Sequence, residues 1–524
     1  MRLGSHLNAG AEGDNVPTMT SLQHIASVAA DWPLFDGAAS RRIEALGASD
    51  LPPHTLMQRA GAAVARLALA LAPHAQRVWI AAGPGNNGGD GFEAAMHLQR
   101  AGKQVHVSAI GDASRRPADA AASFARAQGA GVKVDLGLAD VARADLVIDG
   151  LLGLGHTRPA TGAIADAVRQ VNSQTVPRIA IDLPTGLDAN TGSTLGDAAV
   201  LATHTVALLT LKPGLFTAHG RDLSGDVWFD DLGCGDSTAS VTPRAWLHRG
   251  DMARLLRPHR RHAQHKGSFG DVIVVGGARG MVGAALLAGR AALAAGAGRV
   301  YVSALDPTAP GHDTLWPELM LRPGLWRESL PLLAAATVVC GCGGGDAVRE
   351  ALPTLLARVP RLVLDADALN AIAADVTLRA LLAARAGRDQ ATVLTPHPLE
   401  AARLAGAGSA AQIQCDRLGQ AEHLAAHFGC IVLLKGSGTV IAAPGKATVI
   451  NGSGSARLAS AGTGDVLAGW LAGLWAATQA HAEPVLAHQV AAAAAWLHGA
   501  AADSGDSRTP LPASSLLRRL AEPD

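Results

Sequence analysis

The chain has 524 residues, of which 48% are hydrophobic and 17% are charged, and its formal net charge is zero. This length accommodates two or more domains with substantial cores. The charge balance gives no general electrostatic basis for binding nucleic acid or an anionic membrane, so we expect neither partner.

Residues 1–20 are polar and lack the apolar run of a secretion signal, so we expect a flexible leader and a cytoplasmic protein. The five cysteines form no C-x-x-C pair, which favours reduced thiols over a disulfide framework or a zinc site.

The first half alternates apolar strands with amphipathic helices. We expect helices near 51–72 and 93–102 and strands at 77–82, 104–110, 145–150 and 178–182. The glycines and asparagines before residue 93 should delay the start of that helix by several residues. Such alternation predicts an α/β fold, with a parallel sheet covered by helices on both faces.

A polar, turn-rich stretch at 234–250 interrupts the pattern, and we place a domain boundary there. A second series of strands and helices begins at 271–277, and its last long helix should follow SAGTGD at 460–465. The apolar stretch 466–477 is too short to span a bilayer and should form a buried helix.

The stretch GPGNNGGDG at 83–91 contains the G-x-G-x-x-G spacing of dinucleotide-binding loops, which alone is weak evidence. An aspartate at the mouth, Asp90, would repel a pyrophosphate. A turn without a ligand and a hydride-transferring dehydrogenase both remain open at this point.

Two more polar segments, 149–155 and 182–188, follow strands of the same sheet. Because the carboxyl ends of parallel strands share one edge, these loops should converge there. Asn87, Asp149 and Thr185 offer oxygen ligands for a cation, and Asp182 offers a carboxylate for proton transfer. Each aspartate taken alone is better explained as a helix cap or turn residue, and it is the convergence of three such loops on one edge that favours a site.

The stretches GPGNNGGDG, DGLLGLGHTRP and IDLPTGLD resemble the epimerase family for hydrated NAD(P)H, the YjeF N-terminal domain, over about residues 20–235. The resemblance implies a Rossmann-like, three-layer domain over 21–240 that binds a hydrated nicotinamide nucleotide, NAD(P)HX. It implies K⁺ at Asn87, Asp149 and Thr185, where the family commonly has serine at the last position, and a catalytic Asp182. The implied substrate contacts are Asn86, Asn87, Gly88, Gly89, Asp90, Gly153, Leu154, Gly155, His156, Thr157, Arg158, Pro159 and Asp182.

In the second half, SAGTGD places three residues, 462–464, at a helix start, where free backbone amides form an anion hole. Asp465 lies at its edge and could accept a proton from a hydroxyl that attacks a phosphate, as in ribokinase-type phosphotransferases. Asp365 and Asp367 end a strand and could orient a ribose, a magnesium ion or a water molecule.

Together with HKGSFGDVIVVGG, LTPHP-E and LKGSGT, these motifs resemble the YjeF C-terminal NAD(P)HX dehydratase domain, which is carbohydrate-kinase-like (ribokinase-like). The match covers about 245–515 within a predicted domain 245–524, and Leu399 stands where the family usually has glycine. The resemblance implies Mg²⁺ with ADP or ATP and a catalytic Asp465. The implied hydrate contacts are Ala284, Gly345, His397 and Asp465, and the implied nucleotide contacts are Lys435, Gly436, Ser437, Gly438, Thr439 and Gly464.

The whole chain is thus expected to be an isomerase and a lyase that repairs NAD(P)HX, active as a homo-oligomer. The alternative is a ribokinase-like small-molecule kinase fused to a nucleotide-binding domain. A kinase of that kind would also use the glycine-rich turn and the aspartate of GTGD, but it would not account for GPGNNGGDG. A non-catalytic binding role for the first domain also remains open.

Overall fold

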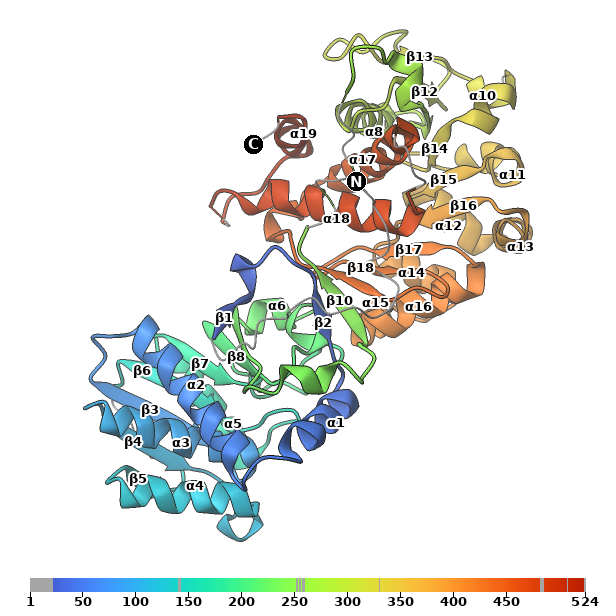
Figure 1. The fold of residues 1–524 in the computed structure, drawn as a ribbon. Helices are drawn as coiled ribbons and strands as arrows, with labels where there is room; N and C mark the ends of the chain where they lie inside the picture. Colours follow the sequence, from blue (N-terminus) through green and yellow to red (C-terminus); the bar gives the residue numbers. More distant parts are fainter. Residues whose placement is uncertain are drawn as a thin grey trace. The chain divides into compact units, whose positions relative to one another are not determined.

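The computed structural model describes residues 22–139, 143–250, 253, 256, 260–328, 330–480, 485–506 and 508–522. The predicted leader lies outside the described residues. The chain divides into two compact units, residues 2–245 and residues 246–524 (Figure 1). Within the described ranges, no helix has both the length and the apolarity that crossing a bilayer requires.

The N-terminal unit contains a sheet in the order β1-β9-β8-β7-β6-β3-β4-β5, in which only β1 is antiparallel to its neighbour. Because β7, β6 and β3 are adjacent and parallel, the loops that follow them meet at one edge, as predicted. The strands span Gln23–His24 (β1), Arg77–Ala82 (β3), Gln104–Ala109 (β4), Lys133–Leu136 (β5), Leu146–Gly150 (β6), Arg178–Ile181 (β7), His204–Leu208 (β8) and Asp226–Asp230 (β9), and a short β2 spans Trp32–Leu34.

Helices cover both faces of this sheet. Successive side chains of β3 enter different cores, because strand residues alternate between the faces of a sheet. Ile80 packs in the core that contains Phe92 of α3, whereas Trp79 packs in the core that contains Val168 of α5. This arrangement confirms the predicted three-layer domain. The helices span Gly37–Ala48 (α1), Thr55–Leu71 (α2), Asn86–Arg100 (α3), Ala118–Gly129 (α4), Gly162–Ser173 (α5) and Gly220–Leu223 (α6).

Helix α3 begins at Asn86, so the prediction that glycines delay this helix was wrong. The glycines of its first turns are sites of close approach. A Cβ atom at Gly88 would lie 2.0 Å from the carbonyl oxygen of Gly83, and one at Gly89 would lie 2.5 Å from the sulfur of Met57. Packing against these neighbours offsets the cost of a helical glycine, which is about 1 kcal/mol.

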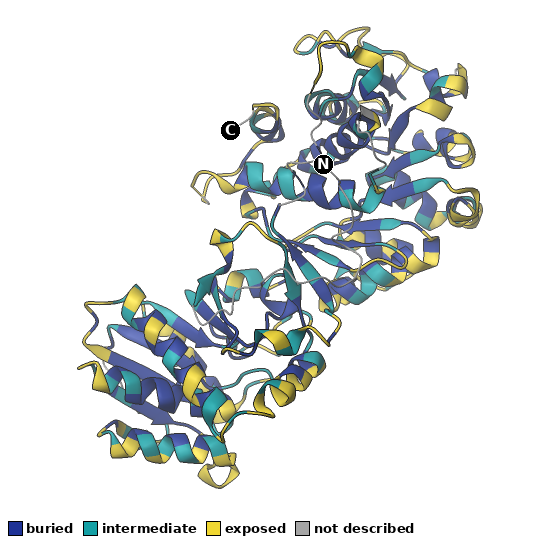
Figure 2. Cartoon of the chain, viewed as in Figure 1, coloured by how far each residue is buried: buried dark blue, intermediate teal, exposed yellow. Residues whose placement is uncertain are grey.

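The C-terminal unit contains strands in the order β13-β12-β11-β14-β15-β16-β17-β18-β19-β10, in which β18 runs antiparallel to both neighbours. They span Ala245–His248 (β10), Asp271–Gly276 (β11), Arg299–Ala304 (β12), Met320–Leu321 (β13), Thr337–Cys340 (β14), Arg361–Leu364 (β15), Ala391–Leu394 (β16), Ile431–Leu434 (β17), Val440–Ala442 (β18) and Val449–Asn451 (β19). The helices span Val282–Ala294 (α8), Leu325–Glu328 (α9), Leu330–Ala335 (α10), Val348–Arg358 (α11), Ala366–Ala374 (α12), Val376–Ala383 (α13), Pro398–Ala405 (α14), Ala410–Cys415 (α15), Arg417–Phe428 (α16), Thr463–Ala477 (α17), Ala487–Asp503 (α18) and Ala513–Ala521 (α19). Strands of both units are mostly buried, whereas the outer faces of many helices are exposed (Figure 2).

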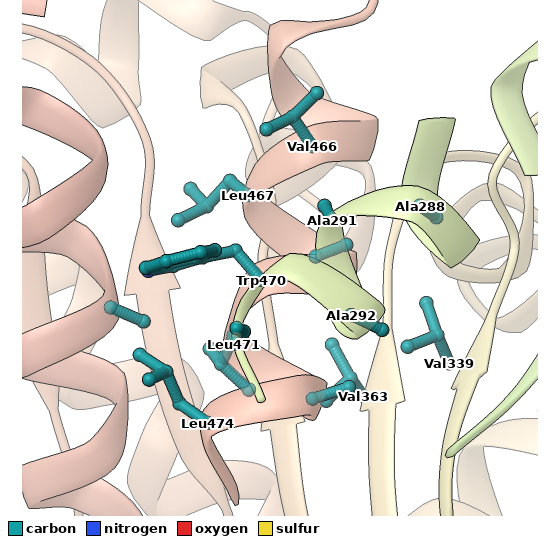
Figure 3. Packing of buried hydrophobic residues seen from close by; sticks show 14 of the residues in the cluster. Ala288, Ala291, Ala292, Val339, Val363, Val466, Leu467, Trp470, Leu471 and Leu474 are labelled. Carbon is teal, nitrogen blue, oxygen red and sulfur yellow. The ribbon is translucent and has the colours of Figure 1, made fainter. Parts of the chain in front are cut away.

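Helix α17 is the centre of the C-terminal core, as the buried-helix prediction required (Figure 3). It lies against α8 at backbone distance, since a Cβ atom at Gly469 would lie 1.9 Å from the carbonyl oxygen of Ala288. Its start was predicted too late: α17 begins at Thr463, inside the SAGTGD motif, and α18 follows as a further long helix. Gly462 precedes it with a φ of 85°, a left-handed conformation that favours glycine.

Candidate functional sites

The N-terminal unit has a cavity of about 930 Å³ at the edge where the three predicted loops meet. Its walls come from α1, from the segment before α2, from the start of α3, and from the ends of β6, β7 and β8. Six charged groups line it: Arg41, Glu44, Asp90, Asp119, Asp182 and Lys212. Carboxyl groups thus outnumber cationic groups in its walls.

Asp182 directly follows β7 and has a φ of 64°, which is uncommon for a residue with a side chain. Its carboxylate contacts the ammonium of Lys212, and the amide of Leu208 donates to the same oxygen over 3.3 Å. The Lys212 side chain is only 2% exposed and also donates to the carbonyl of Leu208 over 2.9 Å. The strained backbone thus aims Asp182 at a buried cation.

Two other carboxyl groups of the cavity have raised pKa values. Burial raises the pKa of Asp90 well above its usual range, and the neighbouring Asp182, Glu44 and Glu93 raise it further. Burial likewise raises the pKa of Glu44, although Lys212 and Arg41 oppose the shift. A carboxyl group with a raised pKa stays protonated at higher pH and can act as an acid.

Asp149 and Thr185, two of the predicted metal ligands, are in contact and buried. The amide and the hydroxyl of Thr185 each donate to Asp149 over 2.8 Å, and the amide of Leu151 donates over 3.1 Å. Burial raises the pKa of Asp149 to about 6, while the hydrogen bonds from Thr185 and Leu151 lower it. A carboxylate in this position is stabilised by donors rather than by a fixed positive charge.

Asn87 lies beside the same loops, since a Cβ atom at Gly153 would lie 3.0 Å from its side-chain oxygen. The buried amide nitrogen of Asn87 has no hydrogen-bond partner. That nitrogen is a hydrogen-bond donor and calls for an acceptor, whereas the side-chain oxygens of Asn87, Asp149 and Thr185 are the ligands that a hard cation prefers. The residues present therefore fit a bound cation.

The other predicted substrate contacts divide into two groups. Those that line the cavity are Asn86, Asn87, Asp90, Gly153, Leu154, Gly155, His156 and Asp182. Those outside its lining are Gly88 and Gly89, which pack α3, and Thr157, Arg158 and Pro159. Burial and the neighbouring Arg158 lower the pKa of His156, which favours its neutral form.

In the C-terminal unit, Asp465 lies in the first turn of α17, next to Cys342 and Asp365. The thiol sulfur and one oxygen of each carboxylate lie within 4.8 Å of one another. Burial raises the pKa of Asp465 to about 6 and Asp365 adds to the shift, whereas a hydrogen bond with Cys342 and the charge of Lys435 lower it. Asp465 is therefore a stronger base than an exposed aspartate.

Lys435 follows β17 and donates to Asp365 over 2.7 Å, and the hydroxyl of Thr395 donates to the same oxygen over 2.8 Å. Gly464 lies beside this pair, because a Cβ atom there would be 3.4 Å from the Lys435 nitrogen. One predicted nucleotide contact from β17 and another from α17 thus meet at one point. A cation and free helix-terminal amides at that point suit a phosphate group.

The predicted loop 436–439 is held by Arg417, a buried cation at the start of α16. Arg417 donates to the carbonyls of Leu434, Lys435 and Gly438 over 3.1, 3.3 and 3.4 Å. Within the loop, the hydroxyl of Thr439 donates to the carbonyl of Gly436 over 3.2 Å. With these carbonyls occupied by Arg417, the loop is fixed in place.

His397 caps α14, accepting hydrogen bonds from the amides of Leu399 and Glu400 over 3.1 and 3.3 Å. In return, Glu400 accepts from the amide of His397 over 2.8 Å. Burial raises the pKa of Glu400 to about 7. Leu399 is helical and 42% exposed, so nothing in this turn requires the glycine usual in similar sequences.

Of the other predicted hydrate contacts, Ala284 lies on α8 and Gly345 lies in the loop after β14. The amide of Gly345 donates to Asp367 over 2.8 Å. A Cβ atom at Gly343 would lie 2.9 Å from that of Ala284 and 2.7 Å from the carbonyl of Met281. This loop therefore packs tightly against α8.

Comparisons with known proteins find one matching protein family for each half of the chain. A family model described as YjeF-related protein N-terminus matches residues 53–214, and one described as NAD(P)H-hydrate dehydratase matches residues 272–520. The bifunctional NAD(P)H-hydrate repair enzyme of Escherichia coli is 34% identical over 88% of this chain and 87% of its own length. That of Leishmania infantum is 37% identical over 89% and 88%. The chain belongs to the bifunctional NAD(P)H-hydrate repair enzyme family.

This chain of the repair-enzyme family is also similar, more distantly, to a solved structure that covers about half of it. The ADP/ATP-dependent NAD(P)H-hydrate dehydratase of Bacillus subtilis, co-crystallised with ATP and Mg²⁺, is 29% identical with a TM-score of 0.43. It covers 51% of this chain and 94% of its own.

Sequence reasoning on this repair-family chain missed several side chains that complete the two sites. Lys212 follows β8 and could have been found as a charged residue at a strand end. Glu44 and Arg417 carry no local signal, because a glutamate or arginine on a helix usually faces solvent. Glu400 belongs to the LTPHP-E motif, but the motif gave it no role, and Cys342 was read only as a reduced thiol. Their burial beside other charges is visible only in the folded chain.

Proposed function

We propose that this chain repairs hydrated NADH and NADPH. The domain at 21–240 interconverts the R and S hydrates, and the domain at 245–524 dehydrates the S hydrate while cleaving ADP or ATP. The observation that carries the proposal is similarity to bifunctional repair enzymes over 88% of the chain. Two separate polar sites, one in each unit, support it.

In the dehydratase, the hydroxyl of the hydrate needs activation, because hydroxide is a poor leaving group at neutral pH. Asp465 accepts the hydroxyl proton while the oxygen attacks the terminal phosphorus of the nucleotide, and the amides of 462–464 stabilise the transferring phosphoryl group. Phosphate then leaves together with a proton from the adjacent ring carbon, which restores the dihydropyridine. The raised pKa of Asp465, about 6, suits a general base near neutral pH.

Lys435, the loop 436–439 and Gly464 bind the nucleotide in this proposal, while Ala284, Gly345 and His397 contact the hydrate. Mg²⁺ supplies charge neutralisation for the phosphates when it is bound with the nucleotide. Asp365, which holds Lys435 by an ion pair of 2.7 Å, is the carboxylate beside Gly464. The ion pair thereby holds the Lys435 ammonium near the proposed position of the phosphate.

In the epimerase, Asp182 is the acid–base group, and Asn87, Asp149 and Thr185 hold K⁺. The ion supplies a fixed positive charge that organises the loops after β3, β6 and β7. The observation that supports a cation here is the buried Asp149 carboxyl, which is held by neutral hydrogen-bond donors. A monovalent ion suits a site with one carboxylate and two neutral ligands.

The test is incubation of the purified chain with each separated epimer, with and without ADP or ATP. Without nucleotide, either epimer should give a mixture of both; with nucleotide, both should yield NAD(P)H. If the nucleotide is cleaved but a stable phosphorylated product accumulates, a small-molecule kinase is favoured instead, a function that the Asp465 motif also fits. If neither epimer changes, both activities are refuted.

A further inference from the structure

The epimerase cavity is lined by four carboxyl groups, Glu44, Asp90, Asp119 and Asp182, where one would suffice for binding. Asp119 pairs with His54 over 2.6 Å. Crowding carboxyl groups costs free energy, because like charges repel and burial disfavours charge. Lys212 relieves this cost for Asp182 by direct contact. Among the residues that the structure describes, no group hydrogen-bonds or ion-pairs with the Asp90 carboxyl, so its cost is not relieved.

The charged groups that face Asp90 are acidic and come from three directions. Glu44 lies on α1, Glu93 lies on the same helix as Asp90, and Asp182 follows β7. Glu93 is itself paired with Arg126 over 2.6 Å, so that arginine is engaged elsewhere. These surroundings and burial raise the pKa of Asp90 well above its usual range. The raised pKa favours the protonated form of Asp90, which lines the same cavity as Asp182.

We propose that Asp90 and Asp182 form the acid–base pair of the epimerase, in which Asp182 takes the hydroxyl proton of the hydrate and Asp90 donates a proton to the ring nitrogen. The inference rests on the proposed epimerase function and gives Asp90 a chemical role in addition to contact with the substrate. Two carboxyl groups whose environments separate their protonation states are the usual basis for assigning one acid and one base.

The chemistry of the hydrate requires both roles. Water adds to an enamine with its proton on the outer carbon and its hydroxyl on the carbon bonded to nitrogen. When Asp182 removes the hydroxyl proton, the oxygen lone pair forms a carbonyl and the carbon–nitrogen bond breaks. The nitrogen takes that electron pair together with the proton of Asp90, which gives an open-chain aldehyde.

Rotation about the single bond next to the aldehyde exposes its other face to the nitrogen. Ring closure then reverses both proton transfers: Asp90 recovers a proton from nitrogen, and Asp182 returns one to oxygen. The product is the other epimer, both carboxyl groups are restored, and no oxidant or other co-reactant is consumed. The carbon–oxygen bond stays intact, which separates this step from dehydration.

The test uses the full chain and follows R-to-S conversion without nucleotide across pH. In the wild type, kcat/KM should fall at alkaline pH as Asp90 loses its proton. Asp90→Asn should lower kcat by about 10²-fold to 10⁴-fold with KM changed by less than about threefold, and should abolish the alkaline limb. Asp90→Glu keeps a carboxyl group and should keep part of that limb.

The matched control is Asp166→Asn, which removes an exposed carboxylate of α5 that pairs with Arg169; its rates and pH profile should equal those of the wild type. Denaturant titration of the same samples, in which the unfolding transition of the N-terminal unit is followed, reports that each variant is folded. If Asp90→Asn raises KM at constant kcat, or keeps the alkaline limb, Asp90 is not the proton donor. If the wild type itself fails to interconvert the epimers, the proposed epimerase function falls instead.

Discussion

Lowering the pH should inhibit dehydration through Asp465. This carboxyl accepts a proton only when it is ionised, and its raised pKa of about 6 places the change near neutral pH. With that pKa, about 90% of the molecules have an ionised Asp465 at pH 7 and about 10% at pH 5. The rate should therefore fall about tenfold over that interval, whereas an unshifted aspartate, at 3.8, would leave it nearly constant.

The hydrogen bond from Cys342 allows the assignment to be tested by mutation. It lowers the pKa of Asp465. In Cys342→Ala, the fall of the dehydration rate on the acidic side of the pH–rate profile (the acidic limb) should therefore move to higher pH. The control is Cys340→Ala, which removes a second fully buried thiol from the same segment. That thiol is not among the groups that shift Asp465, so the control should cost stability without moving the limb.

The assay is the initial rate of NAD(P)H formation from S hydrate at saturating nucleotide, measured from pH 5 to pH 8. Asp465→Asn should lower this rate by about 10²-fold or more while nucleotide binding persists. A rate that stays constant down to pH 5, or equal profiles for the two cysteine variants, would refute the role assigned to Asp465.

Three more outcomes are expected. A fragment of residues 245–524 should consume S hydrate with nucleotide and leave R hydrate until fragment 1–240 is added; equal rates for both epimers with the first fragment alone would contradict this division. Epimerisation should depend on K⁺ and fall in Asp149→Ala, while dehydration persists and Thr185→Ser is nearly silent; equal rates in potassium, sodium and cation-free buffer would exclude the ion. Gly469→Ala should lower the free energy of unfolding of the C-terminal unit by about 3 kcal/mol in denaturant titrations, because its Cβ would lie 1.9 Å from a carbonyl oxygen of α8.

Local patterns in the sequence were sufficient to predict the strands β3, β4, β6 and β7 and the edge at which the loops converge, but not β1, β5, β8 and β9. Strands such as β3 and β11 are apolar runs because both faces of a parallel sheet are covered, and that signal is local. The loop after β3 and the SAGTGD motif were recognisable for the same reason, since a glycine-rich turn is specified by neighbouring residues. The contact between Asp149 and Thr185 followed from the adjacency of β6 and β7.

Only the tertiary structure determined where α3 begins and which charges meet. The helix start depends on the packing of Gly88 and Gly89 against groups outside the helix. Intrinsic helix propensity takes no account of such tertiary contacts. Lys212 reaches Asp182 from 30 residues away, and Lys435 reaches Asp365 from 70. The protonation state of Asp90 likewise depends on burial and on carboxyl groups from other elements, so it is a property of the folded chain and not of any local stretch.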